Sequence, residues 1–210
     1  MRKIVCTGLL AAVWTVGATA AGGKEPPPIA CVAGPGDLPH QDLLELVAHK
    51  KGRVPLERRT GCLADMKGIS VPAVLLSLPE LQGPYSIKVA APVGKTYFMP
   101  AMQLLDEALA VRRTIPAEEL KRRGQEFSIE IFMEKQNADE RYLLVFIDPD
   151  SLGKQDTRTS TRSQTAFIGT GYWIAGVDQT QSMSAVDSGR LTFSVSGELG
   201  DQLKTAKARK

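Results

Sequence analysis

The sequence has few of the side chains that carry most enzymatic and metal chemistry. It contains two histidines and three cysteines in 210 residues, and aromatic residues make up 6% of it. His40 and His49 both lie near a predicted N-terminal helix, and the chain has no nucleophile-elbow or dinucleotide-binding motif. General acid–base catalysis needs a positioned titratable group, and these imidazoles offer no such arrangement. The sequence therefore predicts a non-enzymatic protein without catalytic residues, metal or cofactor.

Long apolar runs are also missing. After the N-terminus, no window has the roughly 18 uninterrupted apolar residues that a membrane-spanning helix needs. The N-terminus itself carries Arg2 and Lys3, a short apolar run over residues 4–16 and then small residues, which is the pattern of an export signal. Residues 1–21 are predicted to be removed as a signal peptide, leaving a periplasmic protein with no membrane insertion.

Charge of one sign is not in excess. The formal net charge is +3, and it falls to +1 once Arg2 and Lys3 leave with the signal. A near-neutral balance gives no general attraction to nucleic acid or to a lipid surface. The basic stretch at residues 204–210 is interpreted as a frayed tail. No nucleic-acid partner is expected.

Cysteine is scarce, but the two that remain after removal of the signal form a natural pair. An oxidising compartment favours a disulfide between Cys31 and Cys62. The bond would close a loop of about 31 residues, for which the chain-entropy model gives roughly 3 to 4 kcal/mol. The alternative, a metal site that adds His40 or His49, has poor ligand spacing.

Composition divides the chain into four predicted segments. These are the signal peptide at 1–21, an N-terminal extension at 22–68, a β domain at 69–198 and a basic tail at 199–210. Within the extension, a lead-in rich in proline and glycine precedes a short helix, with Asp37 as its cap and Gly52 as its stop. The extension is thus predicted to be helical and disulfide-linked.

The β domain is predicted from alternating apolar and polar residues. The expected strands cover residues 85–90, 96–105, 126–134, 141–149, 165–176 and 189–197. The third and fourth of these are predicted to form a hairpin. Residues 71–84, an extended segment interrupted by Pro72 and Pro79, are expected at a sheet edge. Residues 116–124 are expected to form a helical turn or short helix, with Pro116 at its start and Gly124 at its stop. This pattern predicts an antiparallel β-sandwich, jelly-roll or immunoglobulin-like.

Two short stretches resemble chemical motifs but are interpreted as turns. Gly94, Lys95 and Thr96 look like the end of a phosphate-binding loop, yet the required earlier glycine and following helix are missing. Asp106 and Glu107 are adjacent, so on a strand their side chains point to opposite faces and cannot share one reaction. A carboxylate at a strand end usually accepts backbone N–H groups.

A third stretch, residues 148–159, resembles a calcium-binding loop. Asp148, Asp150 and Gly153 occupy its first, third and sixth positions. Leu152 stands where an oxygen ligand is needed, and the bidentate glutamate of the twelfth position is missing. Turn formation is the favoured interpretation, with a weak calcium site as the alternative.

Tyr172 and Trp173 are the candidate ligand-binding residues. They alternate across their predicted strand, so one ring should face a core and the other solvent or a groove. An exposed aromatic ring can stack on the apolar face of a sugar. A core position for Trp173 is the alternative.

Residues 69–197 carry, in order, "VPAVLLSLPELQGPYSIKVAAPVGKTYFMPAMQLLDE", "RYLLVFIDPDSLGKQDT", "GTGYWIAGVD" and "GRLTFSVSG". This series of segments resembles the maltose operon periplasmic protein family, MalM. The resemblance implies a periplasmic accessory protein associated with maltose or maltodextrin uptake, with no catalytic residues to carry over. The first hypothesis is therefore a carbohydrate-transport accessory protein that binds oligosaccharide. The second is a cell-envelope module that contacts another protein and has no sugar ligand.

Overall fold

The chain is mainly β, as predicted. The computed structural model describes residues 31–49, 51–64, 69–168 and 171–201. In this part of the chain fourteen strands accompany one α-helix, four short 3-10 helices and a helical turn at 198–201. Strand pairs are antiparallel apart from the parallel pairs β1–β4 and β13–β6. The predicted signal peptide and most of the basic tail lie outside the described residues.

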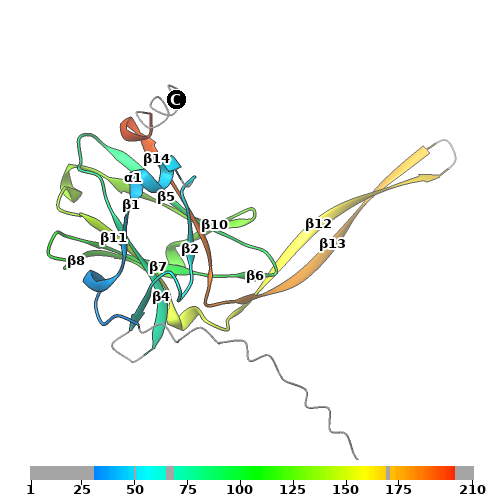
Figure 1. The fold of residues 1–210 in the computed structure, drawn as a ribbon. Coiled ribbons are helices and arrows are strands. Elements are labelled where there is room, and N and C mark those ends of the chain that lie inside the picture. The colour runs from blue at the N-terminus through cyan, green and yellow to red at the C-terminus, as the bar shows by residue number, and fades with distance from the viewer. Residues whose placement is uncertain (1–30, 50, 65–68, 169–170, 202–210) are drawn as a thin grey trace, which may run out of the picture.

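The strands form three sheets (Figure 1). The six-stranded sheet runs β1 (His40–Asp42), β4 (Ser70–Ser77), β11 (Tyr142–Ile147), β7 (Pro100–Leu105) and β8 (Val111–Ile115), with β3 (Cys62–Ala64) also paired to β4. The five-stranded sheet runs β2 (Arg53–Leu56), β14 (Gly189–Gly197), β5 (Tyr85–Pro92), β10 (Glu126–Met133) and β9 (Lys121–Arg123). The third sheet joins β12 (Gln155–Ile168), β13 (Gly171–Ala185) and β6 (Thr96–Tyr97).

The two larger sheets contribute to one hydrophobic core. Leu76, Leu104 and Val145 from the six-stranded sheet are fully buried in the same cluster as Ile87 and Phe193 from the five-stranded sheet. Burial of these side chains supplies most of the stabilisation of the body, at roughly 1.5 to 3 kcal/mol for each large aliphatic or aromatic residue. Alternate residues of each strand thus face a shared interior.

A second, smaller cluster covers the other face of the six-stranded sheet. Leu75 of β4 and Leu144 of β11 pack there with Leu38 and the partly buried Val32 and Leu63 of the N-terminal segment. Strands that are buried on both faces have continuous apolar sequences rather than alternating ones. This explains the unbroken runs "AVLL" and "YLLVF".

The predicted N-terminal helical extension is not supported. The helix α1 spans only Leu43–His49, and Asp42 rather than Asp37 caps it, since the Asp42 Oδ1 accepts the N–H of Glu45 at 2.8 Å. The rest of the segment forms β1, β2 and β3, which pair with β4 and β14 of the two larger sheets. Residues 32–64 are therefore integrated in the sheets.

A disulfide joins Cys31 and Cys62, whose Cα atoms are 4.6 Å apart. Next to it, Val32 donates its N–H to the carbonyl of Cys62 at 2.9 Å, and Ala64 donates to Val32 at 2.8 Å. The bond therefore fixes the start of the described chain against β3, which is itself paired with β4.

The predicted hairpin of residues 126–134 and 141–149 is wrong. Both segments are strands, but β10 pairs with β5 and β9, whereas β11 pairs with β4 and β7. The connection between them, which contains the 3-10 helix η3 (Lys135–Asn137), crosses from one sheet to the other. The alternation of apolar and polar residues identified the two strands, but it could not identify which strands they pair with.

Two further predictions are wrong, and a third is correct only in part. The segment around β4 is not at an edge, because β11 flanks one side of β4 while β1 and β3 flank the other. Residues 96–105 form two strands in different sheets, β6 and β7. The helical turn predicted after Pro116 is present as the 3-10 helix η2 (Ala117–Glu119), but the rest of that segment forms the strand β9. Gly124 has φ of 63°, a left-handed conformation that glycine favours, and it turns the chain into β10.

Candidate interaction site

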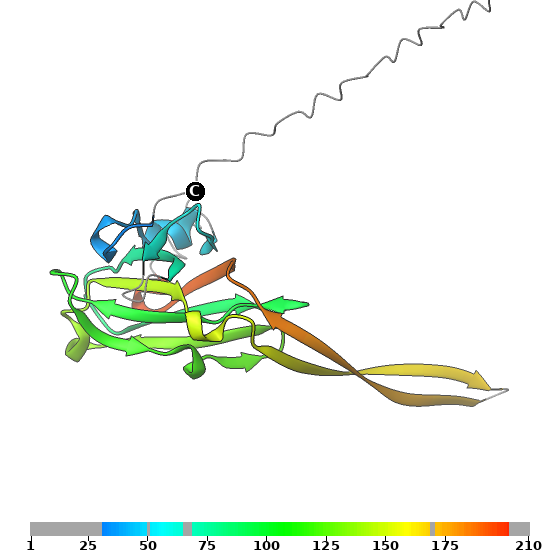
Figure 2. The same ribbon diagram turned by 90° about the horizontal axis from the view of Figure 1, so that it is seen from below.

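The hairpin of β12 and β13 projects from the body as a long arm, residues 155–185. Its register contains 14 antiparallel residue pairs, from Gln155 with Ser184 to Ile168 with Gly171. At about 3.3 Å per residue this corresponds to roughly 45 Å. Figure 1 and Figure 2 both show the arm extending away from the two larger sheets. Its far end therefore stands clear of the core.

The foot of the arm is fixed to the body. Met183 is fully buried in the main core, and Ala185 lies beside it in the same cluster. The N–H of Ala185 donates to the carbonyl of Lys154 at 2.9 Å, and the N–H of Val186 donates to the carbonyl of Tyr97 at 2.9 Å. These contacts set the direction in which the hairpin leaves the body.

The arm changes in composition along its length. Near the body it is rich in Ser, Thr and Gln, and its described side chains from residue 178 to 182 are exposed. Between Arg162 and Asp178 the sequence contains no charged residue. We call residues 163–168 with 171–177 the tip. Polar and β-branched residues favour a solvated strand in the stalk, whereas the tip is rich in apolar residue types.

The tip has apolar residue types on both faces of the strand pair. Position 167 pairs with 172 and position 166 pairs with 173. Directly paired positions share a face, and consecutive positions alternate between faces. In the backbone register, positions 167 and 172 therefore share one face of the strand pair, and positions 166 and 173 share the other. Phe167 is 83% exposed, the most exposed large hydrophobic residue of the described chain.

The predicted ligand residues thus lie at the far end of the arm. Tyr172 and Trp173 belong to β13, not to a strand of the two larger sheets. Their side chains lie outside the described part of the structure, so a role in ligand binding stays a prediction.

The sequence contained a signal for this hairpin that alternation alone did not reveal. A single strand was predicted over residues 165–176, whereas one strand ends at Ile168 and the next begins at Gly171. The Gly169-Thr170-Gly171 sequence between two apolar runs is of the kind that marks a hairpin.

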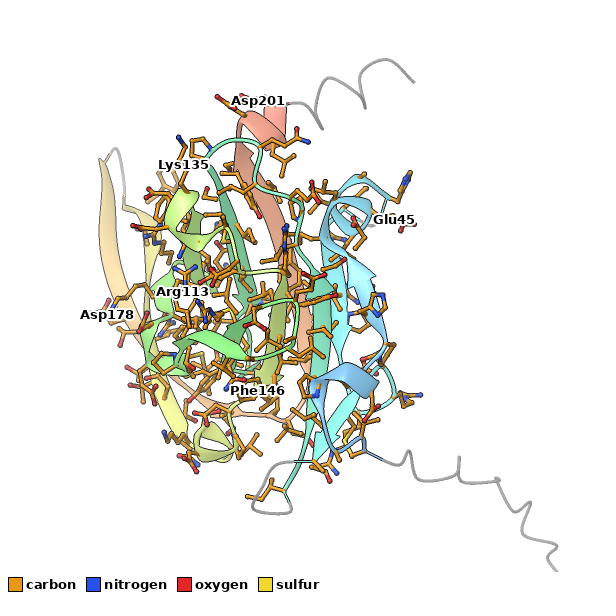
Figure 3. The ribbon with its side chains drawn as sticks, turned by 90° about the vertical axis from the view of Figure 1, so that its left-hand side faces the viewer. Glu45, Arg113, Lys135, Phe146, Asp178 and Asp201 are labelled. Atoms are coloured by element: carbon orange, nitrogen blue, oxygen red, sulfur yellow. A yellow bond between two sulfur atoms is a disulfide. The ribbon has the colours of Figure 1, made fainter. Side chains whose placement is uncertain are left out.

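A cleft of about 570 Å³ lies at one end of the body. It is lined by residues of the β4–β5 connection and of the segment after β10: Leu81, Gln82, Gly83, Pro84, Glu134, Lys135 and Gln136. Figure 3 shows Lys135 and Asp201 toward this same end. We call this the polar-rimmed cleft.

The cleft and the arm foot lie at opposite ends of the five-stranded sheet. Tyr85, next to the cleft, pairs with Met133 and with Gly197. At the other end of the same strand, Pro92 pairs with Glu126 and leads toward β6 at the arm foot. One end of the body thus carries the arm and the other end carries the cleft.

The structure places the first two motif-like stretches in turns. The N–H of Gly94 donates to the carbonyl of Thr96 at 3.0 Å between β5 and β6. The Asp106 Oδ1 accepts the N–H groups of Ala108 and Ala110, both at 2.9 Å, just after β7. This confirms the interpretation of both stretches as turn formers.

The calcium-like stretch also begins with a turn. The Asp148 Oδ1 accepts the N–H of Asp150 at 3.1 Å, and the Ser151 hydroxyl donates to the Asp148 carbonyl at 2.7 Å. These bonds close the 3-10 helix η4 (Pro149–Ser151). Among the described residues, no group of three His, Cys, Asp or Glu side chains is placed to hold a metal ion. His40 and His49 are both exposed.

Comparison with known proteins identifies no relative: no family model, no curated protein and no solved structure matches the chain. Within the described residues, no helix has the length and apolar character to cross a bilayer.

Proposed function

We propose that this protein is an exported, non-enzymatic accessory protein of the cell envelope that binds another protein through the tip of its arm. The observation that carries this proposal is the uncharged tip at the end of a long polar hairpin, with Phe167 83% exposed. Contiguous exposed apolar residues on a soluble protein mark interaction sites. Burial of Phe167 alone would contribute roughly 2 kcal/mol, which is about 30-fold in Kd.

The backbone of the arm supports the same proposal. An isolated two-stranded hairpin is only marginally stable in water. Each of its strands also has an open edge over most of its length, since β13 adds only the short pairing Ser184–Thr96 and Ala185–Tyr97 to the described sheet. Such edges bind other chains readily. A partner would therefore stabilise the arm as well as bury its tip.

The resemblance to the MalM family supplies the setting of this proposal. It supports a periplasmic location and an association with maltose or maltodextrin uptake. The leader-like residues 1–21 and the disulfide of Cys31 and Cys62 fit an exported protein. We also infer that the body is a β-sandwich, because the two larger sheets bury alternate residues in one core.

Oligosaccharide binding is the second candidate. It is favoured by the positions of Tyr172, which pairs with the exposed Phe167, and of Trp173, the next residue of β13. Aromatic rings bind the apolar faces of sugars, whereas hydroxyl groups require hydrogen-bond partners. A sugar would in this case be held by the same tip.

The proposal is tested by photo-crosslinking in cells that produce the protein. A photoreactive amino acid at position 167 should give a discrete adduct with another protein chain. The same amino acid at Val111, which is 52% exposed on β8, is the matched control and should give none. Equal labelling from both positions would contradict a docking role for the tip.

The sugar hypothesis is tested by calorimetry with maltodextrins. Trp14 is predicted to leave with the signal, which makes Trp173 the sole tryptophan of the mature chain and a fluorescent reporter. A saturable signal that Trp173→Ala removes from a folded protein would support sugar binding at the tip. No heat and no fluorescence change across maltodextrins and unrelated glycans would eliminate it.

A further inference from the structure

We propose that the outer face of the five-stranded sheet docks the body, without insertion, on a lipid surface that contains anionic phospholipids. We call this face the basic face; it consists of the outward-pointing residues of β2, β14, β5, β10 and β9. The inference goes beyond the proposed function and does not depend on the arm tip. It rests on four exposed cations of this face, which are Arg53, Lys121, Arg123 and Arg190.

Burial of the core fixes the outward direction of Arg53 and Arg190. Val54 of β2 and Leu191 of β14 are buried in the main core, and these two residues pair with each other. Neighbouring residues of a strand point to opposite faces. Arg53, which precedes Val54, and Arg190, which precedes Leu191, therefore both point away from the core.

Lys121 and Arg123 lie on the same face at the other edge of the sheet. Phe127 of β10 is buried in the main core, and it pairs with Arg122 of β9. Paired residues share a face, so Arg122 is on the inner side, where its Nη1 lies 3.7 Å from the Oδ2 of Asp156. Its neighbours Lys121 and Arg123 point outward and are exposed.

One row of paired residues crosses all five strands between two of these cations. Arg53 pairs with Thr192, Thr192 with Ala90, Ala90 with Ser128, and Ser128 with Lys121. At about 4.8 Å between neighbouring strands, the row is roughly 19 Å long. The cations are therefore spread across the width of the sheet instead of converging on one point.

The two carboxylates at described outward positions already have partners on the face. The Oε1 of Glu126 lies 2.6 Å from the Nζ of Lys88, and the Oε1 of Glu130 accepts the hydroxyl of Ser86 at 2.7 Å. None of the four cations forms a salt bridge within the described residues. The net charge of +3 for the whole chain thus conceals an excess of positive charge on one face.

The basic face fits an extended anionic surface better than a compact anion. Small side chains at Ala90, Ser128 and Thr192 separate the edge cations, so an extended surface can approach both edges together. The groove of about 310 Å³ at the arm foot includes Arg190 but no other described charged residue, so a compact anion there would contact one guanidinium. A bilayer with anionic phospholipids instead attracts every Lys or Arg near its surface. Phe132, four residues after Ser128 on β10, shares this face and is 59% exposed, and aromatic rings are favoured at the boundary between water and lipid.

Sedimentation of the mature chain, residues 22–210, with phospholipid vesicles tests this inference. The protein should bind vesicles of equal parts phosphatidylglycerol and phosphatidylcholine and should not bind vesicles of phosphatidylcholine alone. Added sodium chloride should release it, because exposed charges are screened by salt. Absence of binding to phosphatidylglycerol, or equal binding to both kinds of vesicle, would overturn the inference.

Charge-changing variants locate the contact. Arg53→Gln and Arg123→Gln should each weaken binding about fivefold, the factor expected for one basic residue near an anionic surface. Arg123→Lys should bind as wild type does, because a lipid surface responds to charge and not to guanidinium geometry. Lys135→Gln removes the same charge at the cleft end and is the matched control, with unchanged binding expected (Figure 3). Urea midpoints equal to that of wild type show that each variant is folded.

A compact phosphate site is the alternative that a competition experiment separates. If inorganic phosphate releases the protein at an ionic strength at which chloride does not, the face binds a compact anion and the inference is wrong. An equal loss of binding in Lys135→Gln would also overturn it, because the net charge and not the basic face would then explain the binding. Neither result bears on the crosslink at position 167, which tests the proposed function separately.

Discussion

Glu140 is a buried carboxylate in the connection that crosses between the two larger sheets. Its side chain is 4% exposed, and its Oε2 accepts a hydrogen bond from the Nη2 of Arg113 at 2.8 Å. The buried Nε of Arg113 has no hydrogen-bond partner. This guanidinium on β8 therefore depends on Glu140, and the pair holds the crossing connection against the edge of the six-stranded sheet.

Glu140→Gln should destabilise the protein by about 2 kcal/mol, because it leaves a partly buried positive charge without its partner. Urea unfolding should show a lower midpoint with an unchanged slope. The neighbouring pair Arg112–Asp139 is about half exposed, so Asp139→Asn is the matched control and should cost less than about 0.5 kcal/mol. Equal effects of the two substitutions would contradict the role of burial.

Tyr85 predicts a loss of stability at alkaline pH. Burial, reinforced by the charge of Glu140 and opposed by Arg141, raises its pKa from 10.0 to about 12. Below pH 10 the phenol keeps its proton in both the folded and the unfolded state, so its contribution to the free energy of unfolding is fully present. Between pH 10 and 12 only the unfolded state ionises, and the free energy of unfolding falls as pH rises. Above pH 12 the phenol ionises in both the folded and the unfolded state, and the stabilisation that depends on its proton is fully lost.

This effect is measured by urea unfolding across pH 9 to 12 for wild type and Tyr85→Phe. The difference in free energy of unfolding between wild type and Tyr85→Phe should narrow or reverse as the pH rises, because the variant lacks the titrating phenol. A parallel fall in both proteins would assign the alkaline loss to other groups.

Turn residues were the best-predicted features at the residue scale. The local hydrogen bonds of Asp106 and Asp148 depend only on neighbours within four residues, so sequence was enough to predict them. The ion pair of Glu140 and Arg113 joins residues 27 positions apart. It could not be predicted, because it depends on how the chain crosses between sheets.

At the scale of elements, alternation predicted where strands lie better than which strands pair. β10, β11 and β14 fall within predicted strands, and β5 begins where its predicted strand begins and extends two residues beyond it. Their pairing depends on contacts distant in sequence, such as β4 with β11, which local patterns do not encode. The arm was missed because its polar stalk has no apolar alternation, and because two apolar runs around its end were interpreted as one strand.

The arm should be separable from the body. Thr157 and Ser182 are directly paired, so residues 158–181 can be replaced by Asn-Gly, which favours a two-residue hairpin turn. Met183 and its core contacts are kept. The shortened chain should unfold cooperatively, with a free energy of unfolding within about 1 kcal/mol of wild type. A large loss of stability would mean that the arm supports the core.

The disulfide should stabilise the N-terminal segment on the outer face of the six-stranded sheet. Replacing Cys31 and Cys62 by serine should cost about 3 to 4 kcal/mol, as expected for a loop of 31 residues. Comparison of urea unfolding with and without reductant provides the measurement. In reductant, the free energy of unfolding of wild type should fall to that of the double variant. A wild-type value that reductant does not change would contradict the prediction.

At the scale of the whole molecule, function is argued from the arm at one end of the body and from the basic face of the five-stranded sheet. The sequence led to Tyr172 and Trp173 but placed them in a compact sheet, since no local pattern shows that a strand leaves its core. The cleft was not predicted, because residues 81–84 and 134–136 come together only through the pairing of β5 with β10. The arm tip and the cleft therefore both depend on how the strands pair, which local sequence patterns do not show.

The most direct test of the account is competition for the crosslink formed at position 167. Addition of unlabelled wild-type protein should reduce the adduct, because its tip occupies the same partner site. The chain shortened between Thr157 and Ser182 keeps the folded body and should leave the adduct unchanged. If the shortened chain competes as well as wild type, the body rather than the arm tip makes the contact, and the central claim is wrong.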